Sequence, residues 1–136
     1  MTLRSRDFWF VLSLALLVLG IGIGLRDPWP ADEPRFVLVA KQMVESGDLL
    51  IPHRGHEIYP DKPPLFMWLL TAAHSATGEW RIAFLLPSLL ASLGTIALTF
   101  DLSLKLWGRR AARLAALMLL FAFQFTYQAK RAQIDP

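Results

Sequence analysis

Three long uncharged runs divide this chain and limit its fold more than any other feature of the sequence. The runs cover residues 8–25, 82–100 and 114–129, and charged residues stand directly at their ends. At a rise of 1.5 Å per residue, a helix over residues 8–25 would be roughly 27 Å long, close to the thickness of the hydrocarbon layer of a bilayer. Hydrophobic residues make up 54% of the chain and occur in blocks. We therefore expect an all-α integral membrane protein with three transmembrane helices.

The first run, residues 8–25, has a competing interpretation as a cleaved signal peptide. The apolar region of such a peptide is usually shorter, about 7 to 15 residues, and small residues in an Ala-x-Ala pattern follow it. Residues 25–30 read Leu-Arg-Asp-Pro-Trp-Pro and contain no such pattern. The sequence therefore favours an uncleaved first span, preceded by Arg4 and Arg6 on the cytoplasmic side.

The other two spans are expected on either side of a basic segment. The second span covers residues 82–106, with a kink near Pro87. The third covers residues 114–129, where basic side chains at both ends can reach the polar interface. Residues 107–113 between the spans contain three Arg, and basic loops of this kind stay in the cytoplasm.

This topology places the loop over residues 26–81 and the terminal residues 130–136 on the outer side of the membrane. The loop mixes acidic and basic residues, as expected for a segment that is not held in the cytoplasm. Three carboxylates, those of Asp32, Asp61 and Asp135, would then face the same side. In a bacterium that side is the periplasmic face of the inner membrane.

Two short helices are expected in the outer loop, over residues 34–46 and 63–77. Asp32 is a natural N-cap for the first helix, and Gly47 is its expected stop. Apolar residues recur on one face of this helix, which is too short to cross a bilayer and should lie along its surface. Between the helices, residues 48–53 are expected to be extended and to lead into a turn.

Composition excludes several other classes of protein. The chain has no Cys, so disulfides and thiolate metal sites are absent. The net charge of +3 comes largely from basic residues near the membrane, so it does not indicate a nucleic-acid partner. No Walker, Rossmann or zincin motif is present, and the three His are not placed at the spacing of metal ligands.

An ordered set of motifs in the outer loop resembles a known superfamily. Asp-Glu-Pro-Arg at 32–35 is followed by Glu-Ser-Gly-Asp at 45–48 and by Tyr-Pro-Asp-Lys-Pro-Pro at 59–64, with an apolar helix behind it. This set resembles the N-terminal part of the GT-C integral-membrane glycosyltransferases of the protein O-mannosyltransferase type, in particular the bacterial aminoarabinose transferases. Members are several hundred residues long, so the resemblance implies a partner in the missing C-terminal part of the enzyme.

The resemblance implies a sugar transfer at the outer face of the bacterial inner membrane. Such enzymes take the sugar from a polyprenyl-phosphate-linked donor and pass it to lipid A, a protein or another glycan. A carboxylate can accept the proton of the acceptor, and cations can stabilise the phosphate that departs. The implied partners are therefore the polyprenyl-phosphate-linked sugar and membrane lipids, with no nucleic acid.

The resemblance assigns a role to each residue of the set. Asp32 and Asp135 are implied as catalytic carboxylates. Lys62 and Arg35 are implied to bind the phosphate of the donor.

Three further residues have less direct assignments. Asp61 matches a position that can carry an acidic ligand of a divalent metal ion, but the resemblance implies no certain cofactor. Tyr59 and Glu33 are implied to contact substrate, although Tyr59 can also be read as an interface residue and Glu33 as a complement to the helix dipole.

Structural interpretations compete with these roles. Asp32 and Asp61 can serve only as helix caps, and Arg35 and Lys62 can bind ordinary lipid headgroups. Asp135 can belong to a solvated helix end. The competing class is then a small non-catalytic membrane protein, either a subunit or a lipid-binding partner. A signal-anchored outer domain is disfavoured by the two later apolar runs.

Overall fold

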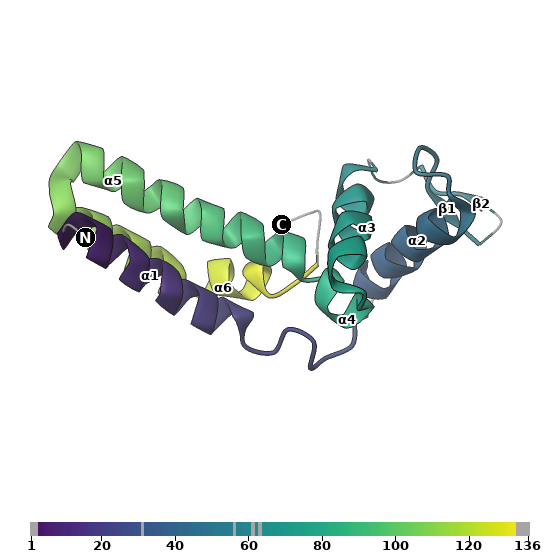
Figure 1. The fold of residues 1–136 in the computed structure, drawn as a ribbon, viewed down its shortest axis with the longest axis horizontal. Helices are drawn as coiled ribbons and strands as arrows, with labels where there is room; N and C mark the ends of the chain where they lie inside the picture. Colours follow the sequence, from purple (N-terminus) through teal and green to yellow (C-terminus); the bar gives the residue numbers. More distant parts are fainter. Residues whose placement is uncertain (1–2, 31, 56, 61, 63, 133–136) are drawn as a thin grey trace. The chain divides into compact units, whose positions relative to one another are not determined.

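The computed structural model describes residues 3–30, 32–55, 57–60, 62 and 64–132, and this part of the chain is mostly helical. The elements in chain order are α1 Leu3–Gly20, α2 Asp32–Ser46, β1 His53–Arg54, β2 Glu57–Ile58, α3 Leu65–Thr77, α4 Trp80–Ala83, α5 Leu86–Phe121 and α6 Phe123–Ala129 (Figure 1). The strands form one short hairpin. The predicted all-α class is confirmed.

The chain forms two compact units. The helical unit comprises Met1–Ile21 and Ser88–Lys130, and the loop unit comprises Gly22–Pro87 and Arg131–Pro136. The loop unit therefore combines the predicted outer loop with the last segment of the chain.

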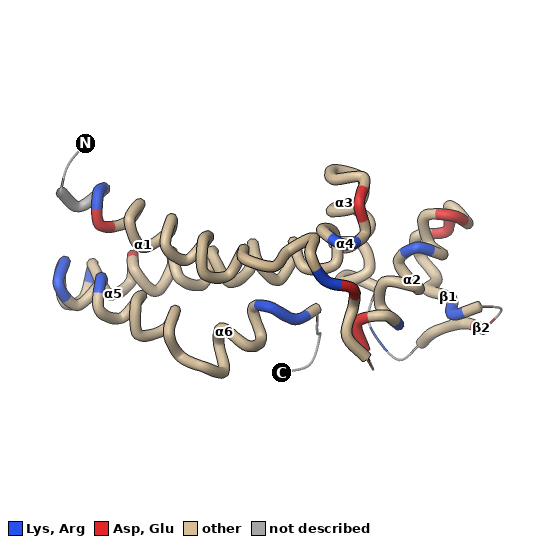
Figure 2. Tube along the Cα trace, turned by 90° about the horizontal axis from the view of Figure 1, so that it is seen from below, with Lys and Arg blue, Asp and Glu red and all other residues tan. Residues whose placement is uncertain are grey.

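In the helical unit, α1 packs against α5. The rings of Phe8 and Phe100 meet edge to face with centroids 5.5 Å apart. Arg109 donates to both carboxylate oxygens of Asp7, and its Nη2 lies 2.9 Å from Oδ1. Figure 2 shows Lys and Arg near the start of α1 and where α5 reverses, while long stretches of these helices carry no charge. This distribution fits helices whose middle parts lie in hydrocarbon.

Gly108 is the point at which α5 reverses direction (Figure 1). Its φ of 82° and ψ of −176° lie in a region that is essentially open only to glycine. The sequence predicted an irregular segment over residues 107–113, whereas the structure confines the break to this one residue. The Arg residues of that segment are good helix formers, so helix continues on both sides of the glycine.

One stretch among the described residues is long and apolar enough to cross a membrane by its length and composition. It runs over Trp80–Phe121, with a mean hydropathy of 1.9 in its most apolar window. α1 differs from its predicted bounds of 8–25, because its 18 residues begin with charged side chains and end at Gly20. The glycine-rich residues that follow favour turns over helix. Three membrane crossings remain a prediction.

In the loop unit, α2 packs against α3 around a buried apolar core. The rings of Phe36 and Phe66 meet edge to face with centroids 5.7 Å apart. The predicted apolar stripe of α2 is buried except at Val44, which is 43% exposed. Burial of each large apolar side chain contributes about 1.5–3 kcal/mol. The core consists of Phe36, Val39, Ala40, Met43, Tyr59, Met67, Leu70, Phe84, Leu85 and Ala132.

Local signals define the ends of the elements in the loop unit. Gly47 has a φ of 73°, and its N–H donates to the carbonyl of Met43, so the predicted stop of α2 is confirmed. The hairpin pairs His53 with Ile58 and Arg54 with Glu57. Of the turn predicted over residues 54–56, Gly55 is a turn residue and Arg54 belongs to β1, while residue 56 lies outside the described residues.

We predict that Gly108→Ala destabilises the protein by about 1–3 kcal/mol, because alanine in this backbone conformation is strained. Gly94→Ala in the same helix is the matched control. A Cβ added at either position meets no heavy atom within 4 Å. Gly94 has no positive φ, so alanine there is expected to stabilise by about 0.5–1 kcal/mol. Thermal unfolding in detergent measures both, and equal shifts would contradict the assigned kink.

Candidate functional site

The first turn of α2 carries two of the predicted site residues as an ion pair. Arg35 donates through Nη2 to Oδ1 of Asp32, three residues earlier on the helix. The Arg35 side chain is 32% exposed and the Asp32 side chain 41% exposed. Both groups are therefore accessible to a ligand. In the absence of a ligand, the carboxylate and the guanidinium partly neutralise each other.

Arg35 lies beside two aromatic rings. Its guanidinium carbon is 5.5 Å from the ring centroid of Phe36 and 5.9 Å from that of Tyr59. Within the described part of the chain, Arg35 Nε and the Tyr59 hydroxyl are buried and have no hydrogen-bond partner. A buried polar group left unpaired costs about 1–3 kcal/mol. These two buried groups therefore keep donor capacity that the described residues do not use.

The remaining predicted residues are placed only in part. Lys62 is partly buried and lies between β2 and α3. Asp61 and Asp135 lie outside the described residues, so their roles stay predictions. No group of three or more His, Cys, Asp or Glu within the described ranges could hold a metal ion.

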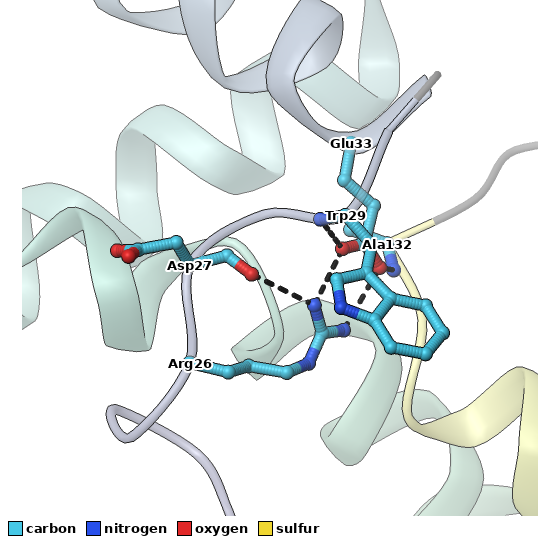
Figure 3. A network of polar contacts seen from close by, with 5 residues as sticks. All are labelled: Arg26, Asp27, Trp29, Glu33 and Ala132. Atoms are coloured by element: carbon cyan, nitrogen blue, oxygen red, sulfur yellow. Dashed lines mark hydrogen bonds and ion pairs between the residues drawn. The ribbon is translucent and has the colours of Figure 1, made fainter.

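Among the described carboxylates of the loop unit, Glu33 accepts the most hydrogen bonds (Figure 3). It is 0% exposed. Its Oε2 accepts from Arg26 Nη1 and from the Trp29 N–H, each at 2.6 Å. Its Oε1 accepts from Arg26 Nη2 and from the Ala132 N–H, each at 2.9 Å. The carboxylate thus joins α2 to residues 26–29 and to the segment that ends the described chain.

These contacts also determine the ionisation of Glu33. Burial by itself raises the pKa of this carboxyl group. The hydrogen bonds from Arg26, Trp29 and Ala132, together with the charge of Arg26, outweigh burial and lower the pKa below its ordinary value of 4.5. Glu33 is therefore ionised at neutral pH despite its burial.

The structure gives Glu33 different partners from the predicted ones. Sequence reasoning implied a substrate contact or a complement to the helix dipole, and substrate contact stays untested. Arg26 and Ala132 were not singled out from the sequence. Arg26 had a usable signal, because it is a charge directly after an apolar run. Ala132 had none, because it is a small residue 99 positions away from its partner.

Two hollows flank the C-terminal half of α2, away from Asp32 and Arg35. One has a volume of about 510 Å³ and is lined by Gln42, Met43, Glu45, Ser46, His53 and Gly55. The other has a volume of about 570 Å³ and is mostly apolar, with Trp68 and Leu50 among its lining residues. Neither hollow brings together the residues that the sequence singled out.

We predict that Glu33 makes the stability of the loop unit depend on acid. Because its pKa is lowered by folding, its contribution is present above the unfolded value of about 4.5 and is lost as the pH falls through the lower folded value. Glu33→Gln should lower the free energy of unfolding at neutral pH by about 3 kcal/mol. This is the lower end of the cost of breaking a buried ion pair, because Arg26 keeps some exposure. Its stability should also vary less below pH 4.5.

Thermal unfolding of the wild type and variants between pH 3 and 7 measures this effect. The control is Glu45→Gln, whose carboxylate is 62% exposed and pairs with Lys41 at 3.7 Å. The pKa of Asp48 is also lowered, by hydrogen bonds from the N–H groups of Leu50 and Ile51, so some acid sensitivity should persist. The prediction would be contradicted if the stability of Glu33→Gln fell with decreasing pH as steeply as that of the wild type.

The comparisons with known proteins agree with the predicted superfamily. Residues 61–135 match the family model for dolichyl-phosphate-mannose-protein mannosyltransferase. The undecaprenyl phosphate-alpha-4-amino-4-deoxy-L-arabinose arabinosyl transferase of Pseudomonas savastanoi pv. phaseolicola is 28% identical over 98% of this chain and 25% of its own length. The Pectobacterium carotovorum protein of the same name is 30% identical over 81% of this chain and 20% of its own length.

A solved structure has the same fold. The crystal structure of ArnT from Cupriavidus metallidurans bound to undecaprenyl phosphate superposes with a TM-score of 0.81 and 26% sequence identity. The match covers 91% of this chain and 23% of the ArnT chain. The chain thus spans about a quarter of the length of these relatives. The predicted resemblance to GT-C glycosyltransferases is confirmed, and the chain belongs to the dolichyl-phosphate-mannose-protein mannosyltransferase family.

Proposed function

We propose that this protein is a membrane glycosyltransferase that moves a sugar from a polyprenyl phosphate to an acceptor at the outer face of the bacterial inner membrane. The observation that carries the proposal is the accessible Asp32–Arg35 pair beside two donors, Arg35 Nε and the Tyr59 hydroxyl, that have no partner among the described residues. Family membership and the relatives that use an undecaprenyl phosphate carrier support it. Because the chain spans about a quarter of those relatives, the activity belongs to the whole enzyme.

Arg35 is proposed to bind the phosphate of the donor. Its planar guanidinium can make charge-assisted hydrogen bonds to phosphate oxygens, which are stronger than bonds between neutral groups. The Arg35 Nε–H has no acceptor among the described residues, and a phosphate oxygen can supply one, while the Tyr59 hydroxyl can donate to the same oxygens or to the sugar. Lys62 is proposed to supply a second positive charge to this phosphate.

Binding of the phosphate would change the state of Asp32. When Arg35 turns toward the phosphate, the carboxylate of Asp32 loses part of its ion pair and can accept a hydrogen bond from the acceptor hydroxyl. The acceptor oxygen then attacks the anomeric carbon, and the carbon–oxygen bond to the phosphate breaks. The phosphate leaves with the bonding electron pair, and the acceptor proton passes to Asp32. Arg35 and Lys62 stabilise the charge of the leaving phosphate.

We predict that Asp32→Asn in the native membrane enzyme lowers kcat for sugar transfer by about 10²–10⁴-fold, the usual contribution of a general base. Affinity for undecaprenyl phosphate should change little, because the amide keeps the shape of the side chain. Lys41→Gln on the same helix is the control, since this side chain is 52% exposed and pairs only locally with Glu45. Transfer at the wild-type rate by Asp32→Asn would remove Asp32 from the mechanism.

We predict that Arg35→Gln weakens binding of undecaprenyl phosphate in nanodiscs by about tenfold or more, the cost of losing a hydrogen bond to a charged group. Tyr59→Phe removes only the hydroxyl and should have a smaller effect in the same direction. Competition against phosphatidylglycerol tests the selectivity for the carrier. Equal affinity for both lipids, without sugar transfer, would favour the alternative of a lipid-binding membrane protein.

A further inference from the structure

Two neighbouring carboxylates at the start of α2 occupy opposite environments. The side chain of Asp32 is 41% exposed, whereas Glu33 is 0% exposed. Successive residues of a helix point about 100° apart, so one carboxylate can face a ligand while the next faces the interior. The buried group is the one that the proposed chemistry leaves unused.

The buried carboxylate of Glu33 uses all of its hydrogen-bond acceptor positions. A carboxylate offers about four acceptor positions, and Glu33 accepts four hydrogen bonds from Arg26, Trp29 and Ala132. Two of the donors are backbone N–H groups in segments that are remote from each other in sequence (Figure 3). Glutamine could not replace it, because its NH₂ would face N–H donors.

Arg26 links this carboxylate to the apolar core of the loop unit. Its guanidinium carbon lies 5.0 Å from the ring centroid of Phe84, which is fully buried, and its Nη1 also donates to the carbonyl of Asp27 at 3.2 Å. Ala132 is likewise part of the core. The network thus fixes the first turn of α2 against the buried core of the loop unit.

We propose that Glu33 is a positioning residue that latches residues 26–29 and 131–132 onto the first turn of α2 and so holds Asp32 and Arg35 in their reactive placement. This inference rests on the proposed function. A catalytic group displaced by about 1 Å can cost about 10²-fold in rate, so a latch one residue from Asp32 affects the reaction without touching substrate. The segment after Ala132 leads to Asp135, so the latch also sets where that segment begins.

Hydrogen exchange measured by mass spectrometry tests the latch in the native protein in nanodiscs. Glu33→Gln should speed exchange in peptides covering residues 27–32 and in those covering 131–132 together, because both contribute N–H donors to one carboxylate. Glu45→Gln is the control and should leave both unchanged. Unchanged exchange in either segment would overturn the latch.

A second pair of variants tests the Ala132 contact alone. Ala132→Pro removes the N–H that donates to Glu33, whereas Ala132→Gly keeps it and loses only the methyl group. The proline variant should speed exchange in residues 27–32 and the glycine variant should not. Equal behaviour of the two variants would overturn the role of this hydrogen bond. If the proline variant does not fold, Glu33→Gln decides the question.

Kinetics distinguish positioning from simple stabilisation. Glu33→Gln should lower kcat/KM by about 10–100-fold in the wild-type background. In an Asp32→Asn background, Glu33→Gln should lower kcat/KM by less than about threefold. The effects of substituting residues that act as a unit are not additive. Gly108→Ala, a destabilised variant outside the loop unit, should keep the wild-type kcat/KM at temperatures where it is folded. If Glu33→Gln lowers kcat/KM by the same factor in both backgrounds, Glu33 has only a structural role.

Failure of the proposed function has a separate signature. A wild-type enzyme that neither binds undecaprenyl phosphate nor transfers sugar would overturn the reaction and with it the positioning role. Hydrogen exchange in Glu33→Gln would still decide whether the latch itself exists.

Discussion

The buried carboxylate of Glu33 is the constraint on which the loop unit depends. A charge removed from water is tolerated only when hydrogen bonds and an opposite charge replace its hydration. Arg26 and two backbone N–H groups from separate segments meet this requirement. The loop before α2, the first turn of α2 and the segment at Ala132 must therefore come together, and any arrangement that separates them leaves an unpaired charge in the interior.

Two adjacent carboxylates, those of Asp32 and Glu33, therefore have different tasks. Glu33 carries the structural charge and is held ionised by its partners. Asp32 stays accessible and shares an ion pair with Arg35, which we propose is exchanged for the donor phosphate. Arg35 also lies beside the ring of Tyr59, and neither its Nε nor the Tyr59 hydroxyl has a partner in the described part of the chain.

Much of the local structure was predictable because its causes are local. The apolar stripe of α2 follows from residue spacing, and its end follows from Gly47, which adopts a backbone conformation that other residues avoid. The bounds of α1 and the break in α5 were less accurate. An uncharged run predicts which residues enter lipid, but helix also extends into charged residues such as Arg4 and Arg109, since arginine is a good helix former.

The sequence by itself determined the class of fold, the order of the elements and the set of ionisable groups near the membrane. Its ordered motifs also identified the superfamily. Only the tertiary structure decided that Tyr59 is buried, that Arg35 turns to Asp32, and that Glu33 faces inward to Ala132. The physical reason is that periodicity and turn chemistry act over a few residues. A hydrogen bond across 99 positions depends on how the whole unit closes.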